Sequence, residues 1–77
     1  MKLQILLFED EKMIAENLQY ALQTEGMTCR HASTATEGLA RLNSEKFDLV
    51  ILDVGLPDMS GFDVCRKIRE NRQIPIF

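Results

Sequence analysis

Two apolar runs organise the pattern of hydrophobic and polar positions in this chain. Residues 3–8 form the first run, which is followed directly by Glu9 and Asp10, and residues 49–53 form the second, which ends in Asp53. Apolar runs without polar alternation are typical of strands buried on both faces, as in a parallel sheet. Both runs are therefore predicted to be strands, with their acids at the strand carboxyl ends.

The segment after the first run changes to the spacing of an amphipathic helix. Gly26 follows it and supplies the residue type that most easily adopts a left-handed conformation, so the helix is expected to stop there. The apolar face of this helix is predicted to consist of Ile14, Leu18, Ala21 and Leu22.

A shorter strand and a second helix are expected next. Residues 27–31 alternate apolar with polar positions and predict a strand near a sheet edge. Residues 34–37 have the spacing of a capping box, which indicates the start of a helix. This helix is expected to turn Leu39 and Leu42 inward and to end near residues 43–44.

A turn-rich loop over residues 55–61 leads from the second run into a third helix. Ser60 is its predicted N-cap, with Asp63 three residues further on. The side chains expected to face the sheet are Phe62, Cys65 and Ile68, with Val64 at their flank.

Residues 74–77 begin a fourth apolar strand and stop without a turn or polar cap. Strands alternating with helices predict an α/β fold with right-handed crossovers and helices on both faces of a parallel sheet. We expect one incomplete doubly wound domain over residues 1–77, with four strands in the order 2-1-3-4 and three helices. The chain is expected to be cut short after the fourth strand.

Composition and charge argue against several classes of function. The 77 residues carry a net charge of −3 with scattered Lys and Arg, which argues against nucleic-acid binding by the chain itself. Cys29 and Cys65 are too few for a zinc site or disulfide framework. No signal peptide or membrane-spanning run is recognisable, so we expect a cytoplasmic protein that does not contact a membrane.

The acids at the two strand ends carry the candidate chemistry. Ligands collect at the carboxyl edge of such sheets, so Glu9, Asp10 and Asp53 are expected to meet there. Two unit charges about 4 Å apart repel by about 4 kcal/mol at an effective dielectric constant near 20, so the cluster should share a proton or bind a cation. Carboxylate oxygens suit Mg²⁺, with Mn²⁺ possible. Asp53, alone at its strand end, is the candidate nucleophile toward a phosphoryl group.

These motifs resemble the receiver domain of two-component response regulators, which has a flavodoxin-like fold. The resemblance rests on the acid pair Glu9-Asp10, on Asp53 at the end of the third strand, and on the Leu-Pro and Gly of the following loop. It implies that Asp53 is the phosphoacceptor and that Mg²⁺ is held by Glu9, Asp10, Asp53 and the Gly55 backbone carbonyl. It also implies a histidine kinase as partner, and a domain that is not an enzyme but assists its own phosphorylation and dephosphorylation.

Residues 62–69 further resemble regulators that carry a winged-helix DNA-binding domain. The parent protein is then expected to control transcription, with DNA contacted only through an output domain that this chain lacks. The family's hydroxyl residue at the end of strand four and its lysine at strand five would fall beyond Phe77. Their absence is expected to weaken phosphoryl transfer.

Alternative functions remain at this level. The half-covered sheet could make the chain a non-signalling association module that forms a homodimer through the face beside the first helix. The acids could be simple helix caps, with Asp10 capping the first helix. A haloacid-dehalogenase-type phosphatase fits poorly because Gly55 stands where a second acid is needed, and no glycine-rich loop supports dinucleotide binding. His31 is assigned no role, and Asp58 is explained by turn chemistry beside Pro57.

Overall fold

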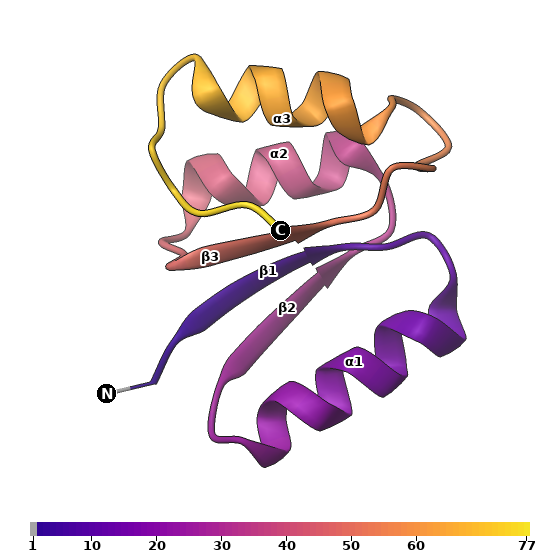
Figure 1. Cartoon of the computed structure of the whole chain (residues 1–77), viewed down its shortest axis with the longest axis vertical. Coiled ribbons are helices and arrows are strands. Elements are labelled where there is room, and N and C mark those ends of the chain that lie inside the picture. Colours follow the sequence, from indigo (N-terminus) through magenta and orange to yellow (C-terminus); the bar gives the residue numbers. More distant parts are fainter. Residues whose placement is uncertain (1) are drawn as a thin grey trace.

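The computed structural model describes residues 2–77 and shows a three-stranded sheet between two helical layers. In Figure 1, α1 lies alone on one face of the sheet, while α2 and α3 lie side by side on the other. No helix in this described part is long and apolar enough to cross a membrane. The elements in chain order are β1 (Gln4–Phe8), α1 (Lys12–Thr24), β2 (Thr28–Ala32), α2 (Ala35–Ser44), β3 (Leu49–Leu52) and α3 (Gly61–Arg69).

All strand pairs are parallel, in the order β2-β1-β3. In the register, Ile5 of β1 stands opposite Cys29 of β2 and Leu49 of β3. The prediction of a doubly wound parallel sheet with β1 inside is therefore confirmed. The second apolar run ends one residue earlier than expected, so Asp53 lies just beyond β3.

The predicted fourth strand is not formed as a strand. The terminal segment does lie parallel to β3, because Val50 donates to the Pro75 carbonyl and Phe77 donates to the Val50 carbonyl, each at 2.9 Å. Only one bridge, between Val50 and Ile76, is completed. Pro75 has no backbone N–H to offer, and three residues are too few for a ladder of several bridges. The segment nevertheless occupies the position next to β3 that the order 2-1-3-4 requires.

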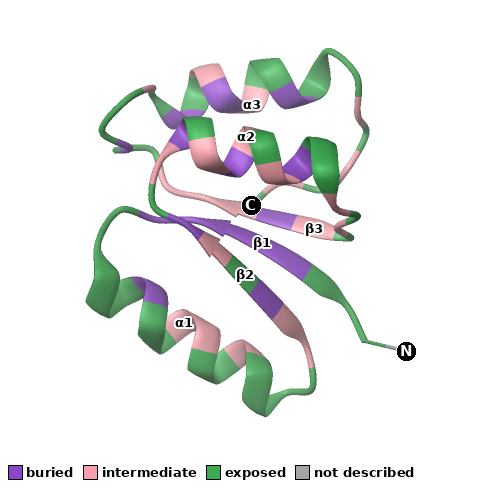
Figure 2. Cartoon of the chain, turned by 180° about the vertical axis from the view of Figure 1, so that it is seen from behind, coloured by how far each residue is buried: buried purple, intermediate pink, exposed green. Residues whose placement is uncertain are grey.

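The core consists of two apolar layers, one on each side of β1. Leu6 and Phe8 contact the layer under α2 and α3, whereas Ile5 and Leu7 contact the layer under α1. Figure 2 shows the resulting band of buried residues along β1. Because successive strand residues point to opposite faces, burial on both faces requires a continuous apolar run, which is the pattern of residues 3–8.

Gly38 lets α2 approach this sheet closely. A Cβ atom added at Gly38 would overlap the ring of Phe8. Gly38 and Phe8 are both buried, so the bare backbone of α2 covers the aromatic ring at the end of β1. The strand end that leads to Glu9 is thus fixed by tight packing against α2.

The inward faces of two helices differ from the prediction. In α1, Ala15 is fully buried and Leu18 and Leu22 pack beside it, while Ile14 and Ala21 are exposed. The small Ala15 side chain permits close approach of α1, and this sets the rotation of the helix.

The prediction for α3 is wrong at Phe62, which is 71% exposed, whereas Val64 and Ile68 are buried. Gly61 explains the rotation. Its Cα faces the backbone of the preceding loop, where a Cβ would come within 2.6 Å of the Asp53 carbonyl oxygen. Residues at positions 61, 64 and 68 share one helical face, so this contact turns Phe62 toward solvent.

Two of the predicted helix starts are confirmed. The Thr34 hydroxyl accepts a hydrogen bond from Glu37 N at 3.1 Å, and the Ser60 hydroxyl accepts one from Asp63 N at 3.2 Å. Gly26 has the expected positive φ of 84°. Asp10 does not cap α1, because the N-cap is Glu11, which forms no side-chain capping bond. Asp10 is therefore available for another role.

Candidate metal centre

The three predicted acids come together at the carboxyl edge of the sheet. Glu9 and Asp10 follow β1, and Asp53 follows β3 directly. The backbone holds both positions, since Glu9 N donates to the Ala32 carbonyl at 3.0 Å and Asp53 N donates to the Phe8 carbonyl at 3.1 Å. These bonds extend the ladders of β1 with its two neighbours, so the sheet itself fixes the acid positions.

One carboxylate oxygen from each of the three side chains lies within 4.8 Å of the other two. Glu9 is buried with 8% of its surface exposed, Asp53 is half-buried and Asp10 is exposed. The ion pairs within residues 2–77 involve none of these three acids. An oxygen-only cluster of negative charge without a protein cation fits a hard divalent cation such as Mg²⁺.

Two further hydrogen bonds involve Glu9, one through its carboxylate and one through its carbonyl oxygen. Glu9 Oε2 accepts from Glu11 N at 3.0 Å, which leaves the second carboxylate oxygen for other partners. His31 Nε2 lies 2.6 Å from the Glu9 carbonyl oxygen. A carbonyl oxygen only accepts, so Nε2 is the donor, and β2 thereby supports the turn between Glu9 and Asp10. No pattern around His31 predicts this bond, because its partner lies 22 residues away along the chain.

The loop after β3 closes on itself beside the acids. Gly55 pairs with Ser60 in an antiparallel bridge, and Gly61 N donates to the Val54 carbonyl at 2.9 Å. Leu56 is buried in the core layer under α2 and α3. Nothing packs within 4 Å of the place where a Gly55 Cβ would stand. The Gly55 carbonyl as a metal ligand stays a prediction.

Asp58 has a structural role that turn chemistry alone does not explain. Its carboxylate accepts hydrogen bonds from Ala35 N at 2.8 Å, Thr36 N at 2.9 Å and the Thr36 hydroxyl at 2.7 Å. These donors belong to the first turn of α2, where backbone N–H groups lack helical partners. The Thr36 hydroxyl bond and the two backbone bonds lower the pKa of Asp58 from 3.8 to about 2.

This bond network predicts a pH dependence of stability. Because the folded-state pKa lies below the ordinary value, ionised Asp58 stabilises the fold above about pH 4 and loses this effect as the pH falls toward 2. We expect Asp58→Asn to lower the free energy of unfolding at about pH 6, and to change it little near pH 2. Urea unfolding of both proteins at the two pH values measures the difference. An equal difference at both would contradict the bonding of an ionised carboxylate.

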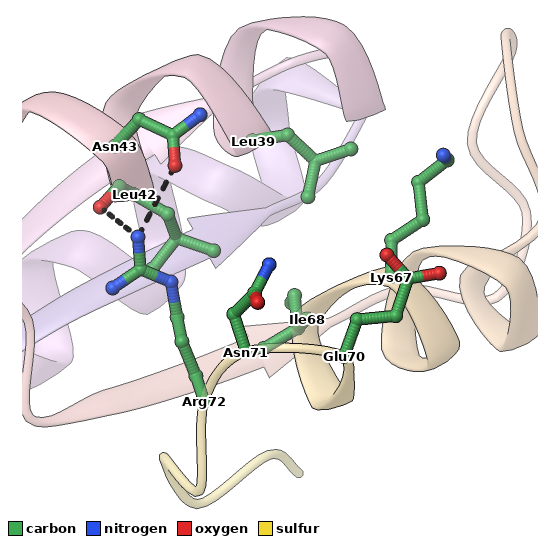
Figure 3. A pocket seen from close by; sticks show the side chains of 8 residues that line it. All are labelled: Leu39, Leu42, Asn43, Lys67, Ile68, Glu70, Asn71 and Arg72. Atoms are coloured by element: carbon green, nitrogen blue, oxygen red, sulfur yellow. Dashed lines mark hydrogen bonds between the residues drawn. The ribbon is translucent and has the colours of Figure 1, made fainter.

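A cavity of about 240 Å³ lies at the other edge of the sheet, between the carboxyl ends of α2 and α3. Figure 3 shows Arg72 reaching across it, where its Nη2 donates to the Leu42 carbonyl at 2.8 Å and to Asn43 Oδ1 at 3.2 Å. The guanidinium thus satisfies a carbonyl at the end of α2, which indicates a structural role. None of the predicted site residues lines this cavity.

Comparisons with known proteins agree with this geometry. The family model for the response regulator receiver domain matches residues 5–77. The transcriptional regulatory protein AfsQ1 of Streptomyces coelicolor is 40% identical over 72 residues, which cover 94% of this chain and 32% of AfsQ1. The chain spans about a third of the length of the curated relatives it matches.

Solved structures show the same fold. The chemotaxis response regulator CheY4 of Vibrio cholerae matches with a TM-score of 0.95 at 28% identity, covering 99% of this chain and 66% of CheY4. The response regulator TrrA of Thermotoga maritima, in complex with the histidine kinase ThkA, matches with a TM-score of 0.92 at 39% identity and the same coverage. TrrA has also been solved in complex with Mg²⁺ and beryllofluoride. Sequence, fold and relatives together establish that the chain belongs to the response regulator receiver domain family.

Proposed function

We propose that this chain accepts a phosphoryl group on Asp53, with Mg²⁺ held by Glu9, Asp10, Asp53 and the Gly55 backbone carbonyl. The observation that carries the proposal is the convergence of three carboxylate oxygens within 4.8 Å of one another at the sheet edge. Bound Mg²⁺, with Mn²⁺ as a substitute, would offset this negative charge and the charge of the phosphoryl oxygens.

The three clustered acids differ in burial, and their proposed roles differ accordingly. Asp53 is half-buried at the end of β3, so its carboxylate can be reached from solvent while its backbone is held by the sheet. In the proposed reaction, a carboxylate oxygen of Asp53 attacks the phosphorus of a phosphohistidine. The bond between phosphorus and the imidazole nitrogen breaks, and an acyl phosphate forms on Asp53. Glu9 is buried and its carboxylate is bonded to Glu11 N, whereas Asp10 is exposed and open to an incoming ligand.

The donor is proposed to be the phosphohistidine of a sensor histidine kinase in the cytoplasm. A regulator of 39% identity was solved in complex with a histidine kinase, which supports this partner. Relatives such as AfsQ1 are transcriptional regulators about three times as long as the matched region. We therefore propose that control of transcription, and contact with DNA, belong to an output domain outside these residues.

Intact-mass spectrometry of the chain after incubation with acetyl phosphate and Mg²⁺ tests the proposal. We expect one phosphoryl adduct that forms with Mg²⁺, is absent with a chelator and is lost at alkaline pH, as acyl phosphates are. Adduct formation that is unaffected by the chelator would show that the acid cluster does not act through a metal ion.

Self-association is a second candidate function, and a specific group of exposed side chains favours it. Leu49 and Ile51 lie on the sheet face beside α1 and are only partly buried. Phe77 is 75% exposed at the edge next to β3, where it lines an apolar groove with Leu52 and Phe62. Exposed apolar groups of this kind are common at interfaces, and a second copy of this chain is the proposed partner through the surface around β3.

Sedimentation velocity at high protein concentration measures this association. We expect a dimer for the wild type and a monomer for Phe77→Glu, because a charge would be buried at the interface. Tyr20→Glu is the matched control, since Tyr20 is equally exposed but lies on α1, away from this groove. A wild type that stays monomeric, or two variants with equal effects, would exclude a homodimer through this surface.

A further inference from the structure

We propose that Asp58 is a positioning residue, through which the first turn of α2 holds the Asp53–Gly61 loop in the geometry that binds the metal ion. The inference rests on the proposed function, because it concerns the same acid cluster. The Asp58 side chain is bonded to α2 and is not one of the proposed metal ligands.

The proposed ligand of this loop is held from within the loop. Gly55 is exposed, forms a bridge with Ser60 and precedes buried Leu56. Glu9 and Asp53, in contrast, are fixed by backbone bonds to the sheet. Loss of a loop anchor should therefore displace the Gly55 carbonyl while the positions of the carboxylates remain.

The loop is held at three places. Its base is closed by the bond from Gly61 N to the Val54 carbonyl and by the bridge between Gly55 and Ser60. Leu56, next to Gly55, is buried in the core. At the tip, only two residues beyond Leu56, the Asp58 carboxylate is bonded to α2. The first two contacts form within the loop or with the core, so Asp58 is the polar contact that ties the tip to another element.

The contact consists of three hydrogen bonds to one exposed carboxylate. Both carboxylate oxygens are used, Oδ1 by Ala35 N and Oδ2 by Thr36 N and the Thr36 hydroxyl. Hydrogen bonds to a carboxylate are about twice as strong as those between neutral groups, and the positive end of α2 favours the negative charge. These three hydrogen bonds lower the pKa of Asp58 to about 2, so the carboxylate stays ionised well below neutral pH.

Isothermal titration of the full chain with MgCl₂ tests the proposal. We expect Asp58→Ala to raise the Mg²⁺ dissociation constant about tenfold, the lower end of what loss of a supporting contact costs at metal sites. The rate of adduct formation from acetyl phosphate should recover to nearly the wild-type value at saturating Mg²⁺, because Asp53 keeps its place. A general loss of folded protein would instead lower the rate at every Mg²⁺ concentration.

Thr34→Ala is the matched control. It removes the capping bond to Glu37 N at the same end of α2 and leaves the contact with Asp58 in place. We expect its Mg²⁺ affinity to equal that of the wild type. Equal losses of affinity in Thr34→Ala and Asp58→Ala would overturn the proposal, because stability of α2 would then account for both.

Thr36→Val supplies a second test that does not depend on the folding of Asp58→Ala. It removes only the hydroxyl bond to Asp58 Oδ2, so a smaller rise in the dissociation constant is expected, and none when Asp58 is already replaced by Ala. Additive effects would contradict a shared anchor. If the wild-type protein fails to bind Mg²⁺ or to form the adduct, the proposed function is wrong. If the wild type does both, and the Asp58 and Thr36 variants bind Mg²⁺ as tightly as the wild type, only the positioning role is wrong.

Discussion

Replacing Asp53 by asparagine is expected to abolish the Mg²⁺-dependent phosphoryl adduct while the chain stays folded. Asparagine has nearly the same shape, and the bond that holds this position uses the backbone N–H of residue 53. The substitution removes the attacking oxygen and one of three clustered charges. Unfolding in the absence of metal should require slightly more free energy than in the wild type, because repulsion within the cluster falls. Intact-mass spectrometry and urea unfolding measure the two effects.

Asp48→Asn is the control for this experiment. Asp48 precedes β3 at the opposite end of the same strand, where its Oδ2 accepts from Gln4 N at 2.7 Å. An asparagine there keeps an acceptor oxygen and changes the net charge of the chain equally. We expect normal adduct formation. An adduct that persists in Asp53→Asn and disappears in Asp48→Asn would place the phosphoacceptor elsewhere.

Replacing Phe8 by alanine is expected to have the largest effect on stability. Phe8 is fully buried, and its ring is covered by Gly38 of α2, which has no side chain to fill a cavity. Truncation of a buried phenylalanine costs about 3–5 kcal/mol. A domain of 77 residues has a total stability of about 4–12 kcal/mol. The variant should therefore lose a large share of its stability, which circular dichroism during urea titration would show as a much lower midpoint of unfolding.

Phe62→Ala is the comparison that makes this result informative. Phe62 has the same side chain and stands in a helix, but it is 71% exposed. We expect its free energy of unfolding to change by about 0.5 kcal/mol or less. A loss as large as that of Phe8→Ala would show that Phe62 faces the sheet, as its sequence pattern first indicated, and would contradict the rotation of α3 described above.

The sequence predicted the parts of the fold that depend on local pattern. Burial of β1 on both faces leaves a continuous apolar run, and the chain position of the acids follows from where such runs end. The hydroxyl caps at Thr34 and Ser60 are likewise local, because donor and acceptor are three residues apart. The meeting of the acids followed from parallel topology, since carboxyl ends of neighbouring strands share an edge.

Features that depend on distant contacts could not be predicted in this way. The rotation of α3 depends on Gly61 lying against the Asp53 backbone, which no periodicity shows. The sequence around Asp58 predicts only a turn, because its partners, Ala35 and Thr36, lie more than 20 residues away. The available signal was indirect: Thr34 satisfies one N–H at the start of α2, and the other N–H groups of the first turn needed an acceptor from elsewhere.

A crystal structure of the chain with Mg²⁺ and beryllofluoride would show which side chain accepts the phosphoryl group and where the metal ion binds. We expect beryllium bonded to a carboxylate oxygen of Asp53, and Mg²⁺ coordinated by Asp10, Asp53 and the Gly55 carbonyl, with Glu9 as a ligand or bonded to a coordinating water. Beryllofluoride bound to another side chain, or a metal ion outside the acid cluster, would contradict the proposed function.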